Sequence, residues 1–394
     1  MREALRLDEN CGLRVRGGAG GVGVVARARG WAGRHGVGVT PPAALRVLPL
    51  VVLGALLGGC DGVTYVLHVA QGQLQSVGAA EPIDDVLASG RLSAEQEAKL
   101  RLAVAAREFA VETIGLNAGE SYTAFLDTSD SPPAFNLSAA RRDALRALTW
   151  TFPIIGEVPY LAFFDEAYLN ESESRLIAEG YDTLSYELDA YSTLGVFEDP
   201  IRSSMLERSE LSLSETIIHE LLHNTIWRSG EAVFNESLAT YVGRTAAAEF
   251  LVAEYGADSG WGEIADAYYS DLDATNAFLL ELYEELESYY AGPASTEEKI
   301  AGREAVYQAA RDRFRNEIQP SLNYPDAFAG YGDLPTNNAW MRLNYRYHLD
   351  LDMFDDVFKA STKDWSTALA VYRAAAEAPE DPFEYLRQWL QEHK

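Results

Sequence analysis

The chain of 394 residues is long enough for one large domain or two to three ordinary ones, and its 47% hydrophobic content indicates a folded core. Its 60 acidic and 32 basic residues give a formal net charge of −28, which argues against nucleic acid as a partner and against a polybasic membrane-binding patch. Two cysteines in a chain of this length exclude a disulfide scaffold.

Residues 1–59 differ in composition from the rest of the chain. They hold eight arginines but only three acidic residues, and they are rich in glycine without a helical or strand period. Two interpretations stay open, a transit-like arm and a start codon assigned too far upstream. The apolar run 47–59 follows Arg46 and has 13 residues, fewer than the ~20 that span a bilayer. It is typical of the apolar part of a secretory signal peptide.

The end of this run, Leu57-Gly58-Gly59-Cys60, resembles the lipobox of bacterial lipoproteins. The resemblance implies that Cys60 is lipidated and becomes the mature N-terminus, so that acyl chains anchor the protein to a membrane. The alternative is a buried apolar segment with an ordinary core cysteine. A leader of 1–59 leaves a single domain of 60–394, whose formal charge becomes −33 once eight arginines and three acids are removed. Without a free cysteine, that domain cannot use a thiol nucleophile or a cysteine-ligated metal.

Beyond residue 60 the pattern predicts an α+β protein that is predominantly α-helical, with a small sheet. The first helix is expected at 93–116, where Ser93-x-x-Gln96 forms a capping pattern. Then come short strands at 122–126 and 147–152, a helix at 165–179 and a strand at 181–188. After Pro200, helices are predicted at 212–228, 235–255, 262–290, 296–317, 338–350, 352–377 and 382–393.

An H-E-x-x-H motif, His219-Glu220-Leu221-Leu222-His223, lies within the amphipathic run 213–227. A spacing of four on a helix places both imidazoles on one face, where they can share a zinc ion. Glu220 then lies beside the metal and can take a proton from a water molecule activated there. The alternative is a helix that carries histidines on its surface for unrelated reasons.

Glu236 is the candidate third ligand, because a catalytic zinc takes three protein ligands and keeps one position open. It stands 13 residues after His223, and Gly230 interrupts the chain so that the second helix can fold back on the first. The alternative is a glutamate near a helix N-terminus that is favoured only by the helix dipole.

His219–His223 followed by Asn235-Glu236-x-x-Ala239 resembles the gluzincin metallopeptidases, in which a glutamate on the next helix is the third zinc ligand. Further blocks make the chain similar to the bacterial putative-aminopeptidase lipoprotein family over about residues 62–350. Val196 and Leu222 stand where that family usually has Trp and Ala, and neither position is a ligand. The matching blocks are Gln71–Leu74, Phe152–Tyr160, Ala190–Gly195, Asp199-Pro200, Asn337–Ala339 and Tyr347-His348.

The resemblance implies a zincin-like catalytic domain with a small antiparallel sheet and one catalytic Zn²⁺. The ion would be held by His219, His223 and Glu236, with Glu220 as general base. Gluzincins also supply a downstream Tyr or His that stabilises the oxyanion. Tyr347 is the first candidate for this role and His348 the second, with ordinary core aromatics as the alternative.

Three further positions are candidate supporting residues. Asn235 is expected to donate a hydrogen bond behind the ligand Glu236. Asn337 and Asn338 are expected either to bind substrate backbone or to begin a helix. Tyr191, with Ser192 and Thr193, is expected either to line the cleft on an edge strand that pairs with substrate or to serve only the fold.

Together these residues predict a zinc peptidase, most directly an aminopeptidase. It would be lipid-anchored on the periplasmic side of the cell envelope, with peptides as its substrates. An endopeptidase of the same chemistry is one alternative. A non-catalytic zinc-binding scaffold lipoprotein is another, although Glu220 argues against it because a structural zinc site needs no general base.

Overall fold

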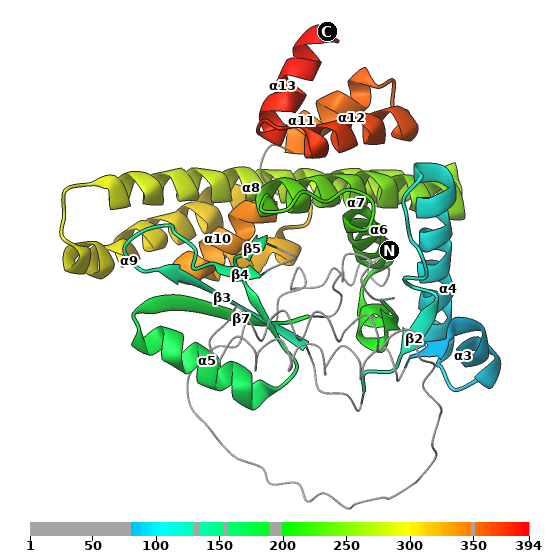
Figure 1. The fold of residues 1–394 in the computed structure, drawn as a ribbon, viewed down its shortest axis with the longest axis horizontal. Helices are drawn as coiled ribbons and strands as arrows, with labels where there is room; N and C mark the ends of the chain where they lie inside the picture. Colours follow the sequence, from blue (N-terminus) through cyan, green and yellow to red (C-terminus); the bar gives the residue numbers. More distant parts are fainter. Residues whose placement is uncertain (1–79, 130–133, 153–155, 189–198, 348–350, 394) are drawn as a thin grey trace, which may run out of the picture.

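The computed structural model describes residues 80–393 apart from four segments, 130–133, 153–155, 189–198 and 348–350 (Figure 1). The leader and Cys60 lie outside the described residues, so the division of the chain at residue 60 stays a prediction. In the part of the chain that is described, no helix is both long and apolar enough to cross a membrane.

The N-terminal elements form a three-stranded sheet beside two helices. Ser93 caps α4 as predicted: its hydroxyl accepts a hydrogen bond from Gln96 N, and the Gln96 side chain accepts one from Ser93 N. Strand β2 pairs antiparallel with β1 and parallel with β8. The elements are β1 (Glu81–Pro82), α3 (Ile83–Ser89), α4 (Ala94–Phe109) with a π-helical turn (Ala110–Ile114), β2 (Ala124–Leu126) and β8 (Ile201–Arg202).

A second sheet, of order β6-β3-β7, is entirely antiparallel. Side chains along its central strand β3 point alternately to two different hydrophobic cores. Phe135, Leu137 and Ala139 pack with helix α5, whereas Ala140 belongs to the core that includes helix α10. A two-stranded hairpin, β4–β5, lies next in the chain. The bounds are β3 (Ala134–Arg141), β4 (Trp150–Phe152), β5 (Gly156–Val158), β6 (Leu161–Phe163), α5 (Glu166–Ala178) and β7 (Tyr181–Leu188).

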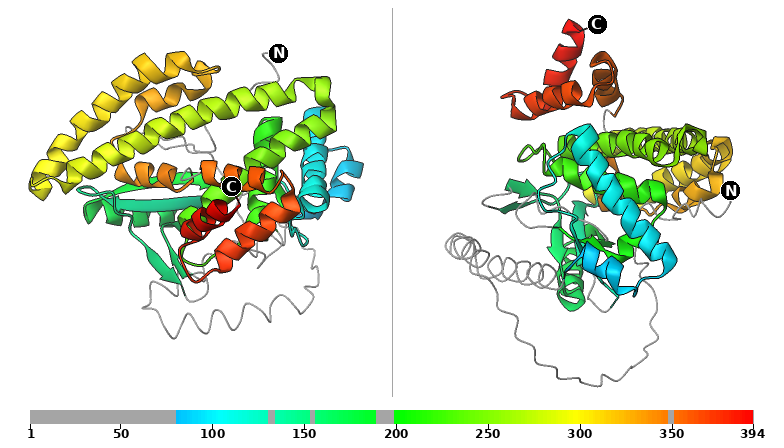
Figure 2. Two further views of the ribbon diagram at one scale, coloured as in Figure 1. Left: turned by 90° about the horizontal axis from the view of Figure 1, so that it is seen from above. Right: turned by 90° about the vertical axis from the view of Figure 1, so that its right-hand side faces the viewer.

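The rest of the described chain is helical. Helices α8 and α9 form a long pair, and α11–α13 gather at one end of the molecule (Figures 1 and 2). The main helices are α6 (Glu210–His223), α7 (Ala232–Tyr255), α8 (Trp261–Ala291), α9 (Thr296–Arg313), α10 (Asn338–Tyr347), α11 (Leu351–Ala360), α12 (Trp365–Glu377) and α13 (Pro382–Glu392). Shorter 3-10 or π turns span Ser203–Glu207, Ala257–Ser259, Phe314–Ile318, Gln319–Ser321 and Pro325–Asp333.

Three hydrophobic cores hold these elements. The largest joins α4, α6 and α7 to the C-terminal helices α11–α13. A second lies among α8, α9, α10 and one face of the β3–β7 pair, and a third lies between α5 and the other face. The helices that carry the H-E-x-x-H motif and Glu236 are therefore at the centre of the largest core.

The predicted class, α+β and predominantly helical, is confirmed, but several boundaries differ. The single helix expected at 352–377 is wrong, because residues 361–364 separate α11 from α12, with Thr362 at φ +55° and Lys363 at φ +58°. The helix expected at 212–228 ends at His223. Strand β3, the central strand of its sheet, is not among the predicted elements.

Candidate metal centre

Helices α6 and α7 approach each other closely enough to bring their polar side chains together. Ser209 caps the start of α6 by accepting a hydrogen bond from Ser212 N. On α7, Gly243 has no Cβ, and one built there would lie 3.1 Å from Glu215 O and 3.3 Å from His219 Cβ. Glycine at this position therefore permits the close approach of the two helices at the level of His219.

Three side chains converge between these helices: His219 and His223 from α6, and Glu236 from the second turn of α7. Glu236 Oε2 lies 3.4 Å from His219 Nε2 and 3.6 Å from His223 Nε2. Their side chains are 15%, 6% and 9% exposed, respectively. The predicted His–His–Glu group is thus brought together, with both imidazoles presenting Nε2 to the same carboxylate oxygen.

These distances fit a shared metal ion better than direct hydrogen bonds. A charge-assisted hydrogen bond between imidazolium and carboxylate is about 2.7–2.9 Å long. Ligand atoms about 2.0–2.1 Å from one ion, at tetrahedral angles, lie about 3.3–3.4 Å from one another. The observed 3.4 and 3.6 Å fall near the second value, and nitrogen and oxygen are suitable donors, so the three residues can hold a metal ion.

The surroundings of the group favour its charged carboxylate. Burial acts to raise the pKa of Glu236, but the imidazoles of His223 and His219 outweigh this effect and hold it below its usual range. The His223 ring packs edge-on against Trp227, with ring centroids 5.5 Å apart. Among the described residues, its buried Nδ1 has no hydrogen-bond partner. Packing therefore orients this ring.

Glu220 lies next to His219 on α6, and its side chain is half-buried. Burial raises the pKa of its carboxyl to about 7, with Glu236 and Asp199 adding to the rise and His219 opposing it. A carboxyl that titrates near neutrality can both accept and release a proton at working pH. The site therefore combines a metal-binding group with a candidate acid–base residue.

Asn235, the predicted donor behind Glu236, hydrogen-bonds elsewhere. Its Oδ1 accepts a hydrogen bond from Arg228 N at 2.9 Å, and its Nδ2 donates one to Arg228 O at 2.8 Å. Both polar atoms of the amide thus bind the backbone of the α6–α7 connection. Asn235 therefore fixes the backbone next to Glu236 and makes no hydrogen bond to the Glu236 carboxylate.

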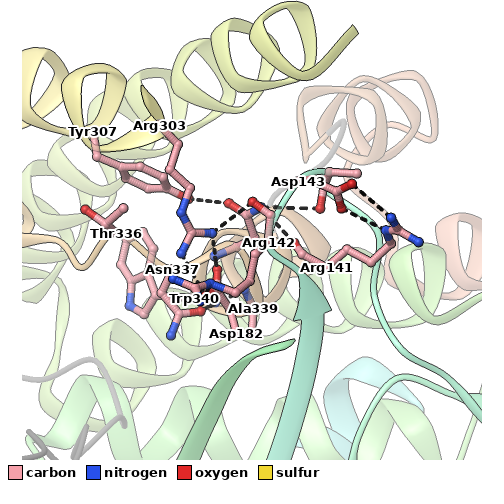
Figure 3. Close-up of polar contacts among 12 residues, drawn as sticks. Arg141, Arg142, Asp143, Asp182, Arg303, Tyr307, Thr336, Asn337, Ala339 and Trp340 are labelled. Atoms are coloured by element: carbon pink, nitrogen blue, oxygen red, sulfur yellow. Dashed lines mark hydrogen bonds and ion pairs between the residues drawn. The ribbon is translucent and has the colours of Figure 1, made fainter. Parts of the chain in front are cut away.

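Asn338 is the first residue of α10 and Asn337 directly precedes it, which is the second of the two roles predicted for them. Figure 3 shows Asn337 beside Ala339 and Trp340. Asn337 Oδ1 accepts hydrogen bonds from Ala339 N and Trp340 N, as a capping side chain does. Asn338 is fully buried; its Oδ1 accepts hydrogen bonds from the hydroxyls of Tyr290 and Tyr307. The protein itself occupies the polar atoms of both side chains.

The oxyanion and cleft candidates lie at or beyond the edge of the described residues. Tyr347 is the last residue of α10, and its side chain is not described. His348 and Tyr191 fall in the segments 348–350 and 189–198, outside the described residues. Their predicted roles stay predictions.

Sequence reasoning missed a charged group that supports α6 and α7 from the side of α8. Arg244 on α7 lies 3.9 Å from Glu215 of α6 and 3.0 Å from Asp273 of α8, and the Tyr269 hydroxyl donates to Glu215 at 3.2 Å. A usable signal was present in the spacing, because Glu215 precedes His219 by four residues and shares its helix face.

A family model described as "Putative aminopeptidase" matches residues 64–384, which is most of the chain and includes all three residues of the metal-binding group. Comparison with curated proteins gave no match, and neither did comparison with solved structures. The match agrees with the resemblance of the sequence blocks, and the chain belongs to the Putative aminopeptidase family.

Proposed function

We propose that the protein is a zinc-dependent peptidase that acts as an aminopeptidase. The observation that carries the proposal is the convergence of two imidazole Nε2 atoms on one carboxylate oxygen, at 3.4 and 3.6 Å, beside Glu220. Two histidines and one glutamate are a ligand set of catalytic zinc sites in peptidases. Family membership supports peptidase chemistry independently of this geometry.

In this proposal His219, His223 and Glu236 hold the ion. When bound, zinc would lower the pKa of a water molecule toward neutrality and polarise the carbonyl of the scissile peptide bond. Glu220 accepts the proton of the attacking water and passes it to the leaving amine. Its raised pKa, about 7, suits both directions of transfer. Tyr347 and His348 remain our candidates for the donor to the oxyanion.

We further propose that acyl chains on Cys60 anchor the protein to a membrane and that the peptidase faces the periplasm. The support is the Leu57–Cys60 block and the apolar run before it. A strongly acidic mature chain would favour substrates with positive charge, among them peptides with a free α-amino group.

Metal analysis and a paired-peptide digest test this function. The chain with Cys60→Ser, purified without lipid, should hold one zinc ion and cleave peptides with a free N-terminus much faster than their N-acetylated counterparts. Similar cleavage of both would indicate the alternative function, an endopeptidase of the same chemistry.

Glu220→Gln separates catalysis from metal binding. The amide keeps the shape of the side chain but cannot accept the proton, so zinc should remain bound while kcat falls at least 100-fold. Glu254→Gln, on the exposed side of α7, is the matched control and should keep full activity. Zinc binding without hydrolysis in the unaltered chain would instead favour the scaffold lipoprotein, and absence of bound zinc would refute the proposed function.

A further inference from the structure

The connection between α6 and α7 is fixed by a pair of hydrogen bonds next to the third ligand. Arg228 N donates to Asn235 Oδ1 at 2.9 Å, and Asn235 Nδ2 donates to Arg228 O at 2.8 Å. Asn235 is only 2% exposed and directly precedes Glu236. These hydrogen bonds to the backbone of Arg228 therefore fix the position of the first turn of α7 and, with it, the backbone of Glu236.

The side chain of Arg228 ties this connection to the C-terminal helices. Its Nη1 donates to Ala375 O at 3.2 Å and to Ala378 O at 2.8 Å, at the last turn and C-cap of α12. Carbonyls at a helix C-terminus have no partner within the helix and carry partial negative charge. A guanidinium is thus held there by both hydrogen bonding and charge.

Aromatic packing fixes the same end of α7 from a second side. Phe234, fully buried, has its ring centroid 5.9 Å from that of Phe354 on α11 and 5.6 Å from that of Phe383 on α13. Two turns further along α7, the Tyr241 hydroxyl donates to Asp355 of α11 at 3.2 Å. All three C-terminal helices therefore contact the part of the chain that surrounds Glu236.

We propose that α11–α13 position the third metal ligand, and that Arg228 is the positioning residue through which α12 acts. This inference rests on the proposed function, because it assumes that Glu236 binds zinc. Ligands must be held within about 0.5 Å of their working geometry, and supporting residues are worth about 10–100-fold in metal affinity. Residues 228, 234 and 235 fix the backbone on which Glu236 is carried.

Zinc affinity of the full chain, measured by competition with a chromophoric chelator, tests the inference. Arg228→Gln removes the charge at the end of α12, and we expect zinc binding to weaken at least 10-fold with an unchanged far-UV circular dichroism spectrum. Arg228→Lys keeps a cationic donor and should recover part of the loss. Arg387→Gln is the matched control, since Arg387 is 47% exposed on α13 and pairs with carboxylates near the start of that helix.

Cobalt substitution gives a readout that loss of stability alone would not change. At saturating Co²⁺, Arg228→Gln should show altered visible absorption because the carboxylate ligand is displaced, whereas Arg387→Gln should keep the wild-type spectrum. An Arg228→Gln variant with wild-type zinc affinity and cobalt spectrum would overturn the inference alone. An unaltered chain that binds no zinc would overturn the proposed function as well.

If Arg228→Gln does not fold, Asn235→Asp is a second variant that tests the same positioning role by its zinc affinity. Aspartate keeps the acceptor for Arg228 N but loses the donor to Arg228 O. Zinc affinity is expected to fall in the same direction, and an affinity equal to that of the wild type would again overturn the positioning role.

Discussion

Gly243 offers a direct test of how the distance between α6 and α7 controls the metal centre. In Gly243→Ala the new methyl group would lie 3.1 Å from Glu215 O, 3.3 Å from His219 Cβ and 3.4 Å from Glu215 Cγ. The first of these contacts is with backbone, which cannot rotate away. The helices must therefore separate by a few tenths of an ångström at the level of a metal ligand.

Two effects of opposite sign determine how much Gly243→Ala changes the free energy of unfolding. Overpacking in a buried helix interface costs about 1–3 kcal/mol, whereas alanine in place of glycine within a helix gains about 0.5–1 kcal/mol. We expect a net loss of about 1 kcal/mol in the free energy of unfolding. The larger effect should fall on metal affinity, because the displacement is applied to His219 itself, and a 10-fold weakening of zinc binding is expected.

Urea unfolding of the zinc-free protein and chelator competition measure the two effects separately. Gly262→Ala on α8 is the matched control, because a Cβ there would meet only Val252 Cγ2, at an ordinary 3.7 Å. It should leave zinc affinity unchanged and stability unchanged or slightly higher. A Gly243→Ala variant that is more stable than the wild type and binds zinc equally well would refute this reasoning.

Two other predictions concern stability. The pKa of Asp143 is lowered to about 2 by hydrogen bonds from Arg141, so Asp143→Asn should cost about 1–2 kcal/mol at pH 7. That difference, followed by urea unfolding, should shrink as the pH falls below 4 and disappear only below pH 2, where the carboxyl is protonated in both states. A constant difference would contradict this prediction. Arg303→Met leaves Asp182 buried without its closest partner, at 2.5 Å, and should cost about 3 kcal/mol in urea unfolding. Arg303→Met with Asp182→Leu should recover only part of this loss, because Asn338 N then loses the carboxylate that accepts its hydrogen bond.

The metal-binding group could be predicted because the spacing of its two histidines is a local feature of the sequence. Two histidines four residues apart meet on one face wherever a helix forms, whatever the rest of the chain does. Glu236 required one further step, a connection short enough to bring the next helix back, and Gly230 provided that signal. The structure brings all three together, while the identity of the metal stays a prediction.

Strand β3 is absent from the prediction although residues 135–139 alternate apolar and polar side chains, which is the local pattern of a strand. The burial of both its faces is the part that the sequence does not show. Phe135, Leu137 and Ala139 alternate with Asn136 and Ser138, and all five are buried. The polar positions are accommodated by neighbouring elements, as where Asn136 Nδ2 donates to the Tyr186 hydroxyl of β7. Such burial depends on residues some 50 positions away, which a local period does not show.

The break between α11 and α12 has a similar cause. The positive-φ residues Thr362 and Lys363 are neither glycine nor proline, so the strongest turn signals are missing. The weaker signal is Asp364, whose carboxylate accepts a hydrogen bond from Thr367 N and caps α12. The turn allows Phe358 and Trp365 to pack together, with ring centroids 4.3 Å apart. Long-range packing of the C-terminal helices thus overrides the local helical preference.

Two arginines connect helix α7 and the segment before it to neighbouring helices. In the connection before α7, Arg228 binds the carbonyls that end α12. Within α7, Arg244 lies between Glu215 of α6 and Asp273 of α8. Neither cation is among the main groups that set the pKa of Glu236 or of Glu220. A cation beside the ligands would weaken metal binding by charge repulsion, so these two arginines tie α7 to its neighbours from outside the group of ligands.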